Sequence, residues 1–156
     1  FTEFQSLLQE NYVMKWRNTV QSKPKLRTYN QIKDSFETEE YVKYINNRRE
    51  RSILAQFRCG ILPLELETGR YRNINVDNRF CFHCANLVED ELHFALVCPL
   101  YNLERQLLFD EVMLTYTIFI NLDQLNKLKV LLNEFWKQTS KFLYKSWNIR
   151  RNLLWR

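Results

Sequence analysis

Three of the four cysteines in this chain and both of its histidines fall within one short segment, CFHCANLVEDELHFALVC. The spacing in this segment is Cys81-x2-Cys84-x8-His93-x4-Cys98. A Cys-x2-Cys turn directs both sulfurs to the same side, and thiolate and imidazole groups are ligands that Zn²⁺ prefers in a tetrahedral site. The spacing therefore predicts that Cys81, Cys84, His93 and Cys98 bind one zinc ion, and any fold of the chain must bring these four side chains together.

The predicted site is structural rather than catalytic. Four protein ligands fill the usual shell of zinc, which leaves no position for a water nucleophile. A helix that begins near Asp90 is expected to carry His93 and to end by about Val97, before Pro99. Cys98 lies too far round a regular helix to share the face of His93, so we expect a turn to bring it back to the ion.

Two other interpretations of the cluster stay open from the residues alone. Cys81 and Cys84 can form a disulfide of the kind found in redox proteins, although no βαβ pattern surrounds them. Alternatively, the cysteines are unligated core residues and His93 is incidental. We expect His83, between the two knuckle cysteines, to point away from the ion, and Cys59 to be a small buried apolar group.

Composition predicts one mainly α domain. The length of 156 residues suits a single domain, and a hydrophobic content of 46% is ample for a core. Only two glycines and three prolines occur, which favours helices over a β fold with many turns. We therefore expect residues 1–156 to form a single helical domain, with a zinc-binding knuckle over residues 76–99 built from a short hairpin and a helix.

Helical periodicity places most of the elements. Residues 26–36 are ambiguous between extended chain and a short helix, and residues 64–80 suggest loop and short strand. Thr38 is expected to cap the second predicted helix and Gly60 to end the third. The predicted helices cover about residues 2–19, 38–45, 46–60, 100–116, 123–135 and 135–156. The apolar face expected for the helix at 100–116 consists of Leu100, Leu103, Leu107, Leu108 and Val112.

The net charge of +5 suits a polyanionic partner, and three sets of basic residues are candidates for phosphate contacts. A loop set before the knuckle ranks first because aromatic residues adjoin it, and the set in the last helix ranks second. The alternative is that these residues form ordinary solvated helix faces. The candidates are Arg48, Arg51 and Arg58 in the helix at 46–60, Arg70, Tyr71, Arg72 and Arg79 in the loop, and Lys141, Lys145, Arg150 and Arg151 in the last helix.

The sequence also predicts the compartment. No apolar run approaches the roughly 20 residues needed to cross a bilayer. The first residues, FTEFQSLLQE, carry acids where a signal peptide carries Lys or Arg. We therefore expect an intracellular protein, nuclear or cytoplasmic, with reduced cysteines and no membrane partner.

The segments CFHC and VEDELHFALVCPLYN resemble the zinc-binding domain at the C-terminal end of reverse transcriptases from non-LTR (LINE-type) retrotransposons. That family shares the Cys-Cys-His-Cys knuckle, often with an acidic pair before the His and a Cys-Pro after it. The preceding FRCGILPLELETGRY is also similar, so the resemblance covers roughly Arg51 to Arg105. It implies an accessory module of a retroelement protein that binds template RNA or target DNA.

The adjacent aspartates of the polymerase active site are absent, since the sequence contains no Asp-Asp. We therefore expect a non-catalytic chain, either a C-terminal fragment or a free-standing relative. A second hypothesis is a protein-interaction module that docks to a partner or to its parent polymerase, as the aromatic residues Trp16, Trp136, Trp147 and Trp155 suggest. A small enzyme is the weakest hypothesis, because no nucleophile–base pair or phosphate-binding glycine loop is evident.

Overall fold

The structure, a computed structural model, describes residues 2–154; Phe1, Trp155 and Arg156 lie outside the described residues. The described part is helical, and its β pairing is limited to one isolated antiparallel bridge between Phe80 and Val88. The prediction of a mainly α fold is therefore confirmed. None of the helices in residues 2–154 combines the length and apolar character that crossing a membrane requires.

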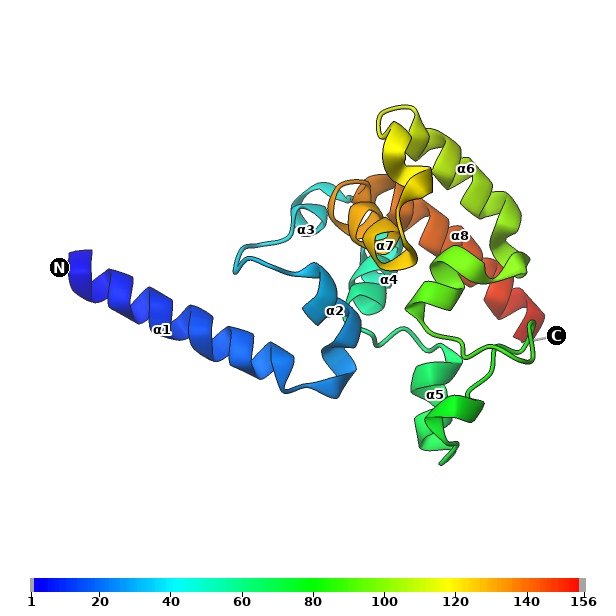
Figure 1. The fold of residues 1–156 in the computed structure, drawn as a ribbon, viewed down its shortest axis with the longest axis horizontal. Helices are drawn as coiled ribbons and strands as arrows, with labels where there is room; N and C mark the ends of the chain where they lie inside the picture. The colour runs from blue at the N-terminus through cyan, green and yellow to red at the C-terminus, as the bar shows by residue number, and fades with distance from the viewer. Residues whose placement is uncertain (1, 155–156) are drawn as a thin grey trace.

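The longest helices lie at the two ends of the described chain, and α1 projects from the body that the other helices form (Figure 1). The elements are α1 (Thr2–Gln21), η1 (Pro24–Leu26), α2 (Arg27–Ile32), α3 (Glu40–Tyr44), α4 (Arg48–Arg58), α5 (Glu65–Tyr71), η2 (Val76–Asn78), η3 (His93–Val97), η4 (Pro99–Tyr101), α6 (Asn102–Met113), η5 (Thr117–Asn121), α7 (Gln124–Asn133) and α8 (Trp136–Leu154). Of the η elements, η3 is a π-helix and the others are 3₁₀-helices.

The core lies where α4 packs against α8, with α7 and η3 completing it. Leu54 and Phe57 of α4 are fully buried. Phe94 of η3 is also fully buried, and its ring centroid lies 6.1 Å from that of Phe57 and 4.5 Å from that of Tyr101. This aromatic chain fixes the helix of the candidate metal cluster to the centre of the domain.

Gly60 ends α4 in the left-handed conformation, with φ 66°. The Gly60 N–H donates to the Phe57 carbonyl, and the Ile61 N–H donates to the Gln56 carbonyl, which is the bonding pattern of a Schellman cap. A Cβ added at Gly60 would lie 2.5 Å from the carbonyl oxygen of Lys25. Glycine is therefore required here both for the backbone conformation and for the close approach of η1.

Residues 27–32 form α2, so the helical alternative holds for this part of the ambiguous segment at 26–36. Several other local predictions are wrong. Glu39 rather than Thr38 occupies the N-cap position of α3. Residues 65–71 form α5 where loop and strand were expected. On α6, Leu103 is 75% exposed and Leu107 is 54% exposed. The face of α6 that turns inward consists of Arg105, Leu108 and Val112.

Candidate metal centre

The ligand atoms of Cys81, Cys84, His93 and Cys98 all lie within 4.8 Å of one another, close enough to hold a metal ion. Cys98 Sγ lies 3.9 Å from Cys81 Sγ and 3.8 Å from Cys84 Sγ. Sulfurs at the corners of a tetrahedron around zinc, each about 2.3 Å from the ion, are about 3.8 Å apart. The cysteines are free, so the disulfide interpretation is wrong for this structure.

The imidazole of His93 has the properties of a ligand. Its Nε2 atom is buried and has no hydrogen-bond partner among the described residues. Burial lowers the pKa of His93, although the carboxylates of Asp90 and Glu89 act in the opposite direction. The neutral imidazole that results offers a lone pair, as metal binding requires. By contrast, His83 is exposed to solvent, in agreement with its predicted position.

Three thiolates this close together are unfavourable neighbours without a cation. Burial, together with the adjacent Cys81 and Cys84 sulfurs, raises the pKa of the Cys98 thiol to about 12. Burial also raises the pKa of Cys84. A divalent cation favours the thiolate over the thiol, because it attracts each sulfur anion and the thiol loses its proton on binding. The donor set and its spacing therefore fit a metal better than they fit a cluster of neutral thiols.

A tight hairpin presents the first two cysteines. The bridge between Phe80 and Val88 closes it, and the Cys81 N–H donates to the Leu87 carbonyl at 2.8 Å. The Ala85 N–H donates a hydrogen bond to the Cys81 carbonyl at 2.8 Å, and Ala85 adopts the left-handed conformation at φ 60°. This backbone turn confirms the predicted short hairpin, which is reduced to a single bridge.

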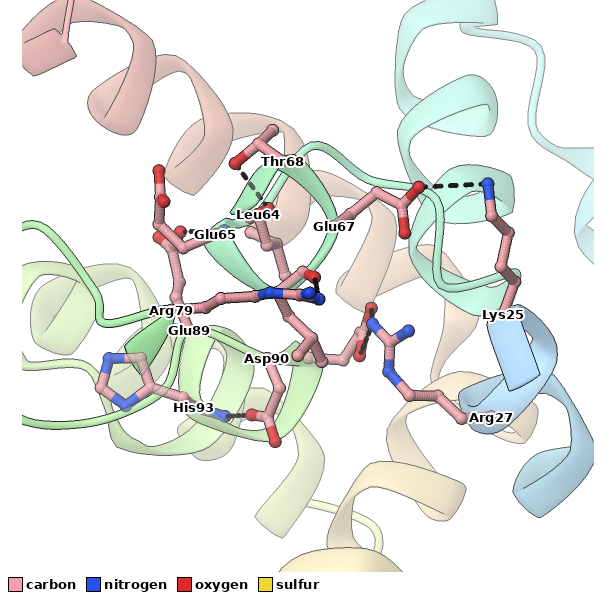
Figure 2. Close-up of polar contacts among 12 residues, drawn as sticks. Lys25, Arg27, Leu64, Glu65, Glu67, Thr68, Arg79, Glu89, Asp90 and His93 are labelled. Carbon is pink, nitrogen blue, oxygen red and sulfur yellow. Dashed lines mark hydrogen bonds and ion pairs between the residues drawn. The ribbon is translucent and has the colours of Figure 1, made fainter. Parts of the chain in front are cut away.

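A π-helix brings the last two ligands together. Asp90 Oδ1 accepts the His93 N–H at 2.7 Å and so caps the start of the helix (Figure 2). The Cys98 N–H then donates to the His93 carbonyl at 2.8 Å, five residues back. In an α-helix, residues five apart are about 140° apart around the axis, whereas the wider π turn joins residues five apart by a hydrogen bond and so brings them closer to the same face. The sequence analysis expected a regular helix followed by a turn, so the π-helix is a correction.

Arg105 of α6 holds the end of this π-helix. Its buried guanidinium donates to the carbonyl of Ala95 at 2.8 Å, to the carbonyl of Cys98 at 2.6 Å and to Asn102 Oδ1 at 2.7 Å. These bonds satisfy carbonyls that a helix leaves unpaired at its C-terminus. Arg105 therefore positions the backbone of one candidate ligand, a role that no pattern in the sequence indicates.

Glu89 connects the knuckle to two helices. Its carboxylate is 1% exposed and accepts two hydrogen bonds from Arg150 of α8, at 2.8 and 2.7 Å. It also accepts the backbone N–H of Glu65 at 2.7 Å, which caps α5 (Figure 2). Because this cap comes from residue 89, the local sequence around α5 could not reveal the helix.

Glu91 connects the knuckle to the N-terminal part of the chain. Its buried carboxylate accepts two hydrogen bonds from Arg27 of α2, at 2.7 and 2.9 Å. Burial raises the pKa of Glu91, and the Arg27 guanidinium opposes that shift. A parallel link joins Lys25 to the buried Glu67 of α5 at 3.2 Å (Figure 2).

Three of the predicted nucleic-acid contacts are interior residues, and their predicted surface position is wrong. Arg58 is 1% exposed and pairs with Glu39 at 2.9 Å. Arg79 is buried and donates to the carbonyls of Ile74 and Leu66. Arg150 is buried and forms an ion pair with Glu89 at 2.7 Å. Guanidinium groups that already bond to buried partners are not free to contact phosphate.

The remaining candidates lie nearer the surface, but most have partners. Arg70 pairs with Glu67, Arg72 with Glu65 and Lys145 with Glu104, while Arg51 donates to the Ile45 carbonyl. Tyr71 is exposed beside Arg70. Within residues 2–154, the basic candidates that form neither an ion pair nor a side-chain hydrogen bond are Arg48, Lys141 and Arg151.

Two of these free residues line the same groove. The groove lies between α4 and α8 and has a volume of about 640 Å³. Arg48 and Arg49 line it from α4, and Tyr144, Trp147 and Arg151 line it from α8. Arg49 beside the phenol lowers the pKa of Tyr144. The helix packing thus joins the first and third predicted sets and adds Arg49, which the sequence analysis missed because its proximity to α8 is a tertiary effect.

Comparison with known proteins finds no matching family model, no matching curated protein and no matching solved structure. The metal cluster and the α4–α8 groove are therefore the observations from which function is inferred.

Proposed function

We propose that this chain is a zinc-stabilised, non-catalytic module that binds nucleic acid through the α4–α8 groove. The observation that carries the proposal is the convergence of Arg48, Arg49 and Arg151 on one concavity that also contains Tyr144 and Trp147. No carboxylate side chain is among the described residues that line it. Unpaired guanidinium groups beside aromatic rings are the combination with which proteins bind nucleic-acid backbones and bases.

Zinc is the ion that best suits the cluster. Three thiolates and one imidazole form a soft to borderline donor set, which favours zinc over the oxygen-preferring Mg²⁺ and Ca²⁺. When bound, zinc would supply a cross-link between the hairpin, the π-helix and the turn at Cys98. Four protein ligands close the shell, so the role we assign to it is structural.

The metal cluster and the groove are physically connected. The Arg150 guanidinium carbon lies 5.5 Å from the ring centroid of Phe82 in the hairpin and 5.2 Å from that of Trp147 in the groove. Arg150 also bonds to Glu89, between the cysteine pair and His93. A metal-held hairpin would therefore fix Arg150, and through it the position of Trp147.

The resemblance of roughly Arg51 to Arg105 to the zinc-binding domain of non-LTR reverse transcriptases supports the same proposal. In that family the module accompanies a polymerase, so template RNA and target DNA are the two candidate ligands. An origin in a retroelement is accordingly part of the proposal.

Fluorescence anisotropy with labelled RNA and DNA, single- and double-stranded, tests this function. We expect binding at low salt that weakens as salt rises, because each phosphate that the protein neutralises releases a counterion. Each such phosphate contributes about −0.7 to −0.9 to the slope of the logarithm of the binding constant against the logarithm of the salt concentration. The double variant Arg48→Ala/Arg151→Ala should reduce both affinity and slope. The matched control Lys15→Ala/Arg17→Ala removes equal charge from exposed positions on α1. Absence of binding to every probe at low salt would overturn the proposal.

A second candidate function is protein interaction, which the surface of α1 favours. Phe4, Leu7, Leu8 and Tyr12 are all more than half exposed on this projecting helix. The tryptophans that first suggested the function give less support, since Trp16 packs against Phe36. A strictly monomeric state that captures no partner would count against this candidate.

A further inference from the structure

We infer that the α4–α8 groove is built for single-stranded nucleic acid and takes one unstacked base against Tyr144 and Trp147. This inference rests on the proposed function and specifies its substrate class. The volume of about 640 Å³ falls within the range of pockets that bind small organic groups, roughly 300–1,000 Å³.

The charges lie on both walls of the hollow. Arg48 and Arg49 belong to α4 and Arg151 belongs to α8, so a strand that follows the groove would have cations on each side. The aromatic residues Tyr144 and Trp147 lie on the α8 wall, and Asn148 adds an amide able to bond to a base edge. In a duplex, the bases are stacked and paired and cannot reach such a surface, but an unpaired base can.

Trp147 is held in place by its own environment. The Arg150 guanidinium lies over its ring, and Arg150 is fixed by two hydrogen bonds to the buried Glu89. An indole that is positioned before the ligand arrives loses little conformational freedom when a base stacks on it. This arrangement also assigns a role to Arg150, which the sequence analysis placed among the phosphate contacts: it positions Trp147 and does not touch the ligand.

The test varies the ligand before the protein. Anisotropy would compare a labelled single-stranded oligonucleotide, the same strand in a duplex, and a strand of equal length whose residues are abasic. The abasic strand keeps the phosphate charge, so any affinity that it loses comes from the bases. We expect the abasic strand to bind at least about tenfold more weakly than the normal strand, because one base–aromatic stack contributes a factor of that order. The duplex should also bind more weakly than the single strand.

Two variants then locate the effect. Tyr144→Ala and Trp147→Phe should weaken binding of the normal strand and leave binding of the abasic strand nearly unchanged. Trp147→Phe should also remove most of the fluorescence quenching that single strands cause, although three other tryptophans remain. The matched control Tyr12→Ala removes an exposed aromatic side chain from α1.

The outcomes separate this inference from the proposed function. If normal, abasic and duplex probes bind equally, or if the duplex binds best, the single-strand inference is overturned while nucleic-acid binding stands. If Tyr144→Ala weakens the normal and abasic strands alike, stacking in this groove is also overturned. If no probe binds, the proposed function and the inference fail together.

Discussion

Glu89, Asp90 and Glu91 are adjacent in the sequence and bond to different parts of the fold. Successive residues near the start of a helix point about 100° apart, so neighbouring carboxylates address different surroundings. Glu89 bonds to Arg150, Asp90 caps the backbone of His93, and Glu91 bonds to Arg27. The acidic run before the histidine therefore has a structural explanation that does not involve the metal directly.

The substitution Glu89→Gln tests this explanation. It removes the negative charge but keeps the side-chain volume, which leaves the buried Arg150 with only a longer contact to the Glu65 carboxylate, at 3.9 Å. We expect the free energy of unfolding to fall by about 3–5 kcal/mol, the usual effect of removing one partner of a buried ion pair. Urea denaturation measures this change. Glu104→Gln breaks the exposed pair with Lys145 and should change stability by less than about 1 kcal/mol. Equal effects of the two substitutions would refute the assigned role.

The buried phenol of Tyr41 should make the free energy of unfolding depend on pH in the alkaline range. Burial raises the pKa of Tyr41 from 10.0 to about 12, so the phenol ionises more readily in the unfolded chain than in the folded one. Between these values the unfolded state loses its proton first, and stability falls as pH rises by at most about 1.4 kcal/mol per pH unit. Tyr41→Phe should flatten this decline in thermal unfolding measured above pH 10. Tyr12→Phe, on exposed α1, should leave it unchanged. A decline as steep in Tyr41→Phe as in the wild type would contradict the assignment.

At the scale of elements, the sequence predicted those features that depend on neighbouring residues. The Cys-His spacing identified the metal cluster, Gly60 the end of α4, and Asp123 the start of α7. Asp123 accepts the Asn126 N–H, as an N-cap residue should. These features involve residues only a few positions apart or side chains with distinctive chemistry, so the pattern alone contains them.

The features that the sequence did not predict depend on distant residues. The helix α5 is capped by Glu89, 24 residues away in the sequence. On α6, Arg105 donates hydrogen bonds to the interior, so the face that carries Arg105 is buried and the face that carries Leu103 and Leu107 is exposed. The π-helix also depends on tertiary structure, because Cys98 must approach His93 for both side chains to reach the candidate metal site. Hydrophobic periodicity cannot register any of these contacts.

Arg105→Ala tests the contribution of α6 to the metal centre. Loss of the guanidinium frees the carbonyls of Ala95 and Cys98, so the turn that presents Cys98 Sγ should become less defined. We expect zinc affinity to fall by about 10- to 100-fold, the typical effect of removing a group that orients a metal ligand. Competition with a chromogenic zinc chelator measures it. Arg72→Ala, at an exposed position, is the control, and unchanged affinity in Arg105→Ala would contradict this role.

At the scale of the whole molecule, the metal cluster lies where several parts of the chain meet. The knuckle bonds to α2 through Glu91, to α5 and α8 through Glu89, and to α6 through the Cys98 carbonyl. These links carry charge into the interior, which explains why Arg150, a basic residue expected on the surface, is buried. Among the described residues, the arginines that line the α4–α8 groove form no ion pair, and for this reason the groove is the surface proposed to bind nucleic acid.

The most direct test of this account is the metal content of the purified protein, measured by inductively coupled plasma mass spectrometry. We expect one zinc per chain in the wild type and in Cys59→Ser, whose cysteine lies outside the cluster, and almost none in Cys98→Ser. Wild-type protein without metal, or equal zinc in Cys98→Ser, would contradict the claim that these four side chains enclose an ion.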